Sequence, residues 1–120
     1  MRFLALSGVL LLVISVAVPV GRKDPKAAVT YATVKPIFQR NCVSCHSGPK
    51  PAHGLDLSTY AKIMKGDKEG KVVIRGKPKM SRMIKAIRRM GATPMPPLKA
   101  LPPRSVQTIE EWVDEGCPND

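Results

Sequence analysis

The sequence has few aromatic and few acidic residues. Of its 120 residues, only one Trp, two Tyr and two Phe are aromatic, and Phe3 lies in an apolar N-terminal segment that stands apart from the rest. Twelve prolines exclude a chain made mostly of regular helix or sheet. The length is that of a single domain. We therefore expect a core whose centre is filled by something other than side chains.

The cysteine count and the charge exclude two classes of protein. Three cysteines are too few, and of the wrong parity, for a disulfide scaffold. Nine Asp plus Glu against twenty Lys plus Arg leave a formal charge of +11. The sequence has no arginine-rich block with interleaved aromatic residues, so we expect no nucleic-acid binding. The surplus charge suits an acidic protein partner or an anionic membrane surface, and its simplest interpretation is a solvated surface of scattered lysines.

Residues 1–21 have the pattern of an export signal or an N-terminal anchor. Arg2 precedes an uncharged, largely apolar run, and the small residues Ser15 and Ala17 suit cleavage near Ala17. The run is also nearly long enough to cross a bilayer, and basic residues follow it at once. Both interpretations stay open. We expect an exported, periplasmic protein that is soluble or tethered to the membrane through this segment.

The rest of the chain divides into a basic linker, residues 22–29, and one domain, residues 30–120. Apolar spacing predicts an all-α domain of three to four short helices. We expect them to run from a cap at Thr33 to Cys42, with Pro36 in the first turn, from a cap at Ser58 to Lys65, from Ser81 to Gly91, and from Pro103 to Glu115.

Long segments between these helices have no helical pattern. Residues 72–74 are β-branched but lack a partner run, which predicts an extended strip and not a sheet. Residues 93–103 contain five prolines (Pro94, Pro96, Pro97, Pro102 and Pro103) and predict a stiff loop. Long ordered loops in a compact domain indicate a function or a bound group that organises them.

Cys42-Val43-Ser44-Cys45-His46 is the C-x-x-C-H pattern of c-type haem attachment. Two thiols three positions apart can both reach the vinyl groups on one edge of a porphyrin, and the adjacent imidazole then meets the iron. One alternative is a redox dithiol, which typically lies between a strand and a helix of a βαβ unit. The other is half of a zinc site. For zinc, only His53 and Cys117 remain as further ligands, and neither has finger spacing.

A haem iron bound by His46 needs a sixth ligand or an open site. The side chains that could supply it are His53, Met64, Met80, Met83, Met90 and Met95. Met95 differs from the other methionines because Pro94 and Pro96 bracket it, so its thioether can be held in place at low entropic cost. The alternative is a methionine that merely packs under a proline-rich loop.

With these residues the chain resembles the planctomycete-type small cytochrome c domains. The resemblance covers roughly residues 30–117. It depends on the order of several motifs: Val34-Lys35-Pro36-Ile37-Phe38, C-x-x-C-H, Gly54-Leu55-Asp56-Leu57, Val72-Val73-Ile74-Arg75-Gly76-Lys77-Pro78 before Ser81, Met95-Pro96-Pro97, Leu101, and Trp112-Val113-Asp114-Glu115-Gly116.

The resemblance implies a small all-α cytochrome c-like fold of short helices and long ordered loops around one covalent haem c. It implies thioether attachment at Cys42 and Cys45, His46 as proximal ligand, Met95 as distal ligand, and the export that haem attachment requires. Two residues depart from the family pattern. His53 replaces a residue that is usually small, which leaves a bis-His iron open, and Cys117 stands where a small residue is common.

The function expected from these residues is electron transfer by a single-haem carrier, not an enzyme. An iron bound by both His46 and Met95 leaves no place for a substrate, and the basic surface would steer the protein to redox partners with acidic docking surfaces. One alternative is a small peroxidase-like enzyme with a labile distal ligand, for which His53 is the candidate base. Another is a haem-bearing sensor or interaction module. For Cys117, we expect either a packed small residue or an intermolecular disulfide.

Overall fold

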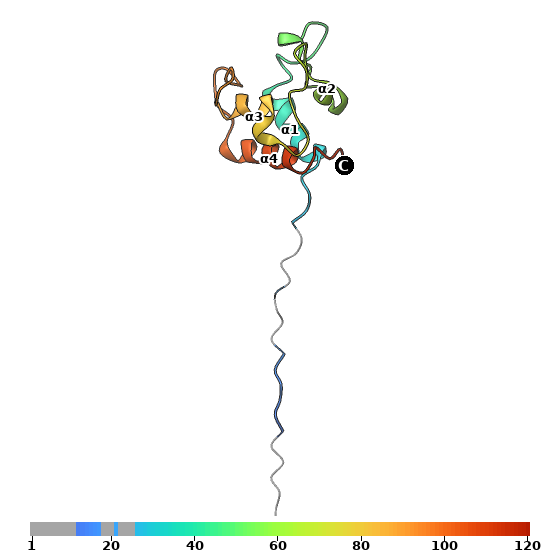
Figure 1. Cartoon of the computed structure of the whole chain (residues 1–120), viewed down its shortest axis with the longest axis vertical. Helices are drawn as coiled ribbons and strands as arrows, with labels where there is room; N and C mark the ends of the chain where they lie inside the picture. Colours follow the sequence, from blue (N-terminus) through green and yellow to red (C-terminus); the bar gives the residue numbers. More distant parts are fainter. Residues whose placement is uncertain (1–11, 18–20, 22–25) are drawn as a thin grey trace, which may run out of the picture.

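The computed structural model describes residues 12–17, 21 and 26–120 (Figure 1). Most of the predicted export signal or anchor (residues 1–21), and part of the predicted linker (residues 22–29), lie outside the described residues. At the end of that linker, Val29 is buried in the core, and its N–H donates to Glu115 Oε2 at 2.6 Å. The folded part therefore begins at or before this residue.

Helices and loops, without strands, make up the described part of the chain, which confirms the predicted all-α fold class. The helices are α1 Tyr31–Asn41, α2 Tyr60–Lys65, α3 Arg82–Ile87 and α4 Pro103–Asp114, with short 3₁₀ turns η1 Ala52–Gly54 and η2 Pro78–Met80. In Figure 1, α4 lies along the base of the domain and contacts both α1 and α3. Each helix in the described ranges is too short or too polar to span a bilayer.

The helix starts at Thr33 and Ser58 were predicted wrongly. Thr30, in an extended conformation, precedes α1, and its carbonyl accepts the N–H of Thr33 at 3.0 Å. Pro36 consequently lies inside the helix instead of in its first turn. Before α2, the hydroxyl of Thr59 accepts the Lys62 N–H at 3.3 Å, while Ser58 is engaged by Asp56. Which hydroxyl group caps the N-terminus of a helix thus depends on competing local hydrogen bonds and not on residue type alone.

Helix α3 is shorter than predicted. It ends at Ile87, and the left-handed backbone of Arg89 (φ 59°) turns the chain away before Gly91. Ser81 precedes the helix as expected, but its hydroxyl makes no capping bond there. Instead Ser81 Oγ accepts the Ile74 N–H at 2.8 Å and donates to the Lys77 carbonyl at 2.9 Å. This fully buried serine ties the extended strip of residues 72–74, which was correctly predicted, to α3.

The aromatic residues of the folded part gather around Trp112 of α4, which is fully buried. Its ring centroid lies 6.0 Å from Phe38, 6.4 Å from Tyr31 and 6.3 Å from Tyr60. Such pairs add about 0.5–1.5 kcal/mol each beyond burial of their area. The indole N–H donates to the Pro118 carbonyl at 3.0 Å, so the same residue also fastens the C-terminal segment.

Cys117 packs beneath this cluster and is fully buried. Its carbonyl accepts hydrogen bonds from Tyr60 Oη at 2.7 Å and Arg75 Nη1 at 3.2 Å. Burial raises the pKa of its thiol above the usual value. The interpretation of Cys117 as a packed small residue is thus favoured over an intermolecular disulfide, for which the sulfur is not accessible.

We expect Cys117 to resist alkylation in the folded protein. A buried, protonated thiol reacts slowly because only the exposed thiolate is a good nucleophile. Residue-resolved mass spectrometry after iodoacetamide treatment at neutral pH should find Cys117 unmodified in native buffer and modified in denaturant. A disulfide-linked dimer of the folded Cys42→Ala/Cys45→Ala variant, in which Cys117 is the remaining thiol, would contradict this on a non-reducing gel.

Gly66 ends α2 in a conformation that only glycine tolerates. Its φ is 82°, and a Cβ there would lie 2.1 Å from the carbonyl oxygen of Gly70. Asp67 and Gly70 are joined by backbone hydrogen bonds of 3.0 and 3.1 Å, so the loop cannot open to make room. The predicted end of the second helix at Gly66 is confirmed. The helix ends there because the chain enters the tight loop closed by Asp67 and Gly70.

Gly66→Ala should destabilise the protein by about 3 kcal/mol, because the backbone strain of a positive φ is added to a steric overlap with main-chain atoms. Gly48→Ala is the matched control, since Gly48 has nearly the same φ, 83°, but open space around its Cβ position. It should cost only about 1 kcal/mol. Urea denaturation of both variants measures the difference, and equal losses would show that the overlap has no effect.

Candidate functional site

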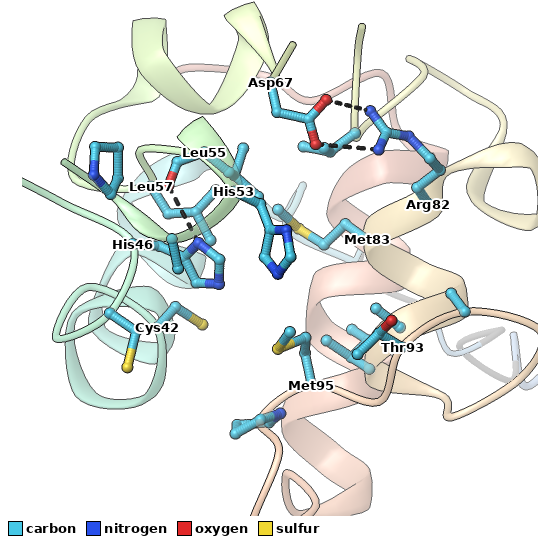
Figure 2. Close-up of a pocket in the computed structure, with 18 of the residues that line it drawn as sticks. Cys42, His46, His53, Leu55, Leu57, Asp67, Arg82, Met83, Thr93 and Met95 are labelled. Carbon is cyan, nitrogen blue, oxygen red and sulfur yellow. Dashed lines mark hydrogen bonds and ion pairs between the residues drawn. The ribbon is translucent and has the colours of Figure 1, made fainter. Parts of the chain in front are cut away.

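A cavity of about 900 Å³ opens in the interior of the domain (Figure 2). Its wall is built from the end of α1, the loop around η1, the loop after α2, the inner face of α3, residues 92–97 and α4. The structure brings every predicted site residue to this wall: Cys42, Cys45, His46 and Met95. Most of the other lining side chains are apolar. This volume is in the range found for cofactor sites, and the surrounding side chains leave it unfilled.

The pentapeptide from Cys42 to His46 continues α1 as a turn. The His46 N–H donates to the Cys42 carbonyl at 2.9 Å, which carries the helical direction one step further. The next loop then fixes the turn from outside, because the Cys45 carbonyl accepts the Ala52 N–H at 2.9 Å and the His46 carbonyl accepts the Leu57 N–H at 2.8 Å. Both cysteines and the histidine are therefore held on a fastened segment.

The imidazole of His46 is almost fully buried and points into the cavity (Figure 2). Its Nδ1 lies 3.1 Å from the carbonyl oxygen of Leu55. A carbonyl can only accept, so Nδ1 carries the hydrogen and Nε2 of the neutral ring keeps its lone pair. This arrangement fixes the ring orientation and the tautomer, as the outer partners of metal-binding histidines do.

The two alternatives for the cysteine motif find little support. Burial raises the pKa of the Cys42 thiol to about 11, so it is protonated at neutral pH. A redox dithiol depends on a lowered thiol pKa. For zinc, no three His, Cys, Asp or Glu side chains within the described part of the chain come together as a metal site.

Met95 reaches the cavity from the loop between α3 and α4. Its N–H donates to the Ala86 carbonyl at 3.1 Å, and its peptide bond to Pro96 is cis. The guanidinium of Arg89 donates to the Pro96 carbonyl at 3.2 and 3.3 Å. The loop is thus fastened to the end of α3 on both sides of Met95. Figure 2 draws Met95 across the cavity from His46.

Of the other candidate ligands, two also line the cavity. His53 lies in η1 with a left-handed backbone (φ 56°), and its ring extends into the cavity in Figure 2. Met83 is a buried residue of the α3 wall. Met80 and Met90 are instead exposed, and neither they nor Met64 belong to the lining. Of the candidate sixth ligands, the structure thus leaves His53 and Met83 beside Met95 in the cavity wall.

A charged pair in the cavity wall was not predicted from the sequence. Arg82 Nη2 and Nη1 lie 2.7 and 3.0 Å from the two carboxylate oxygens of Asp67 (Figure 2). The guanidinium holds the pKa of Asp67 below its usual value. Fifteen residues separate the partners, and no local pattern joins them. Lys68, beside them, also lines the cavity, and its stem lies 3.5 Å from the Cβ position of Gly54.

Comparison with known protein families agrees with this site. Residues 42–99 match the family model described as planctomycete cytochrome C. Over these residues the chain is similar to the cytochrome c domain of that family. The match begins at Cys42 and ends just beyond Met95, and so spans all the predicted site residues. Neither the curated proteins nor the solved structures provide a match.

The family implies covalently bound haem c, and the residues around the cavity fit that group. The wall combines two free thiols three positions apart, an imidazole whose Nδ1 is engaged by the Leu55 carbonyl, and largely apolar surroundings. Haem propionates need positive charge nearby, and Lys68 can supply it, whereas Arg82 is already paired with Asp67 and Glu69. The cavity is thus suited to a large, flat, mostly apolar group that carries iron and two carboxylates.

Proposed function

We propose that the protein is a single-haem c-type cytochrome that carries electrons, with iron bound by His46 and Met95. The observation that supports this most is the fixed imidazole of His46, whose Nδ1–H is taken by the Leu55 carbonyl while Nε2 stays free in the cavity. Met95 lines the same cavity from a loop stiffened by prolines and two sets of hydrogen bonds.

Each residue has a defined role in this proposal. Cys42 and Cys45 would hold the haem covalently, each through one thioether bond. The Leu55 carbonyl fixes the orientation of the His46 ring. The soft thioether of Met95 favours ferrous iron and raises the potential. Once bound, the haem supplies a one-electron couple, and the apolar wall keeps water from it.

Partners and location follow from charge and the N-terminal segment. We propose an exported, periplasmic protein in which residues 1–21 are a signal or an anchor and the cytochrome c domain, residues 30–120, meets acidic redox partners.

One observation favours a second candidate, a peroxidase-like enzyme or sensor with a labile distal ligand. The His53 ring extends into the cavity, where it can replace Met95 or act as a base.

Covalent attachment is the first prediction from this function. Protein made with haem c maturation machinery should keep its haem in a denaturing gel and stain for haem peroxidase activity, because thioether bonds survive denaturation. Cys42→Ala and Cys45→Ala should each weaken the stain, and the double variant should abolish it. Extraction of all haem from the wild type by acidified organic solvent would refute the attachment.

Met95→Ala should abolish the weak near-infrared methionine–iron band, lower the reduction potential, and open the iron to carbon monoxide. The physical reason is loss of the soft ligand opposite His46. Met90→Ala is the matched control, because Met90 belongs to the same connection but is exposed and outside the cavity lining. It should leave all three properties unchanged.

His53→Ala separates the two candidate functions. If the resting iron is bound by His46 and Met95, this variant keeps the wild-type spectrum. A spectral change in His53→Ala, with none in Met95→Ala, would show a bis-His iron. Ready binding of carbon monoxide by the wild type would show an open iron and support the enzyme or sensor instead of the carrier.

A further inference from the structure

Positive charge is concentrated in one continuous part of the sequence. Between Glu69 and Glu110 the chain has no Asp or Glu, but it has ten Lys and Arg residues: Lys71, Arg75, Lys77, Lys79, Arg82, Lys85, Arg88, Arg89, Lys99 and Arg104. The acidic residues that follow lie at the C-terminal end, from Glu110 onward. We name residues 71–109 the acid-free segment. It contains α3, the loop that carries Met95, and most of α4.

The same segment exposes apolar side chains. Within residues 26–120, the large hydrophobic residues with exposed side chains are Met80 at 59%, Met90 at 64% and Leu98 at 98%. All three belong to the acid-free segment. Leu98 is almost as exposed as a free side chain, three residues after Met95. A single exposed Leu is ordinary on a protein surface. Leu98, however, lies beside the cavity and within a strongly basic segment, and an apolar centre with a polar rim is the arrangement found in protein interfaces.

The loop that carries Leu98, residues 90–100, which we call the distal loop, has two faces. Its inner face lines the cavity through Met95, Pro96 and Pro97, whereas Leu98 lies outside the lining. The hydrogen bonds from Arg89 to the Pro96 carbonyl, and from the Met95 N–H to Ala86, hold the loop against α3. Leu98 is therefore presented on a stiff support, which reduces the entropy lost on binding.

The basic residues near this loop are available to a partner. Among the ion pairs in the described part of the chain, Arg88 is paired with Glu110, whereas none involves Lys85, Arg89, Lys99 or Arg104. Lys85 and Arg89 precede the distal loop in the sequence, Lys99 lies in it, and Arg104 lies at the start of α4. Figure 1 shows the loop projecting beyond α3, on the side of the domain away from α2.

We propose that the outer face of the distal loop, with Leu98 at its centre and Lys99 and Arg89 at its rim, is the surface on which an acidic redox protein docks. This inference rests on the proposed electron transfer and gives it a location. Only the loop that carries Met95 lies between a partner bound there and the cavity. The path of an electron from the partner to a haem in the cavity is therefore short. A single apolar side chain with a cationic rim suits a protein partner better than a membrane, which needs a broader apolar face.

The test uses stopped-flow reduction of the haem-loaded protein by reduced plant-type ferredoxin, a small acidic protein with a low potential. At low salt, Leu98→Ser and Lys99→Gln should each slow the second-order rate about threefold, and the double variant about tenfold. Lys99→Gln should also weaken the dependence of the rate on ionic strength, because it removes one charge from the interface. Reduction by dithionite, which needs no docking, should be unchanged.

Met80→Ser and Lys50→Gln are the matched controls. Met80 is exposed in the acid-free segment but belongs to η2, and Lys50 carries the same charge outside that segment. Both should keep the wild-type rate with ferredoxin. If all four single variants slow the reaction equally, or if none does, the distal loop is not the docking surface.

Two further outcomes separate this inference from the function on which it rests. If the wild-type haem cannot be reduced and reoxidised reversibly in a mediated titration, the electron-carrier proposal fails, and the docking surface fails with it. If the carrier is reversible but the loop variants behave as wild type with ferredoxin, only the docking surface fails. Sedimentation of the wild type with phosphatidylglycerol vesicles, lost in Leu98→Ser, would instead show a membrane-binding loop and overturn the protein-docking proposal.

Discussion

The structure depends on one constraint: a small domain is built around a cavity of about 900 Å³ that its own side chains do not fill. The core therefore has two parts. Around Trp112 the aromatic rings pack closely. Both ends of the folded part are fastened there, since the backbone N–H of Tyr31 and the indole N–H of Trp112 both donate to the Pro118 carbonyl. Phe38 belongs to both parts, because it contacts Trp112 and also lines the cavity. A haem in the cavity would thus pack against the same side chain that anchors the aromatic cluster.

The features that could be predicted from the sequence are those set by neighbouring residues. The spacing of Cys42, Cys45 and His46 carries its own geometry, and α1 leads directly into it as expected. The stripe of Ile109, Trp112 and Val113 on α4 is buried as its helical period requires. The shortage of aromatic residues also pointed correctly to an unfilled centre, because too few large side chains were left to fill it.

The features that could not be predicted depend on competition between distant groups. Ser58 has the chemistry of a helix cap, but the nearby carboxylate of Asp56 engages its hydroxyl, and Thr59 caps instead. The pair of Asp67 and Arg82 forms only after Gly66 closes its loop and α3 packs beside it. No sequence window contains that information. The approach of His53 to the cavity likewise results from the left-handed backbone of η1.

The scarcity of acidic residues acquires a structural meaning in the folded domain. At the C-terminal end, carboxylates are used internally: Glu111 pairs with Lys26, Glu110 with Arg88, and Glu115 accepts the Val29 N–H. The contacts of Glu111 and Glu115 hold the start and the end of the domain together, whereas that of Glu110 joins α4 to the end of α3. Glu110 thus neutralises one cation near the distal loop, Arg88, whereas none of the ion pairs in the described part of the chain involves Arg89 or Lys99. If the acids were spread more evenly along the chain, the positive charge of the acid-free segment would be neutralised locally, and the long-range field that steers an acidic partner would be weaker.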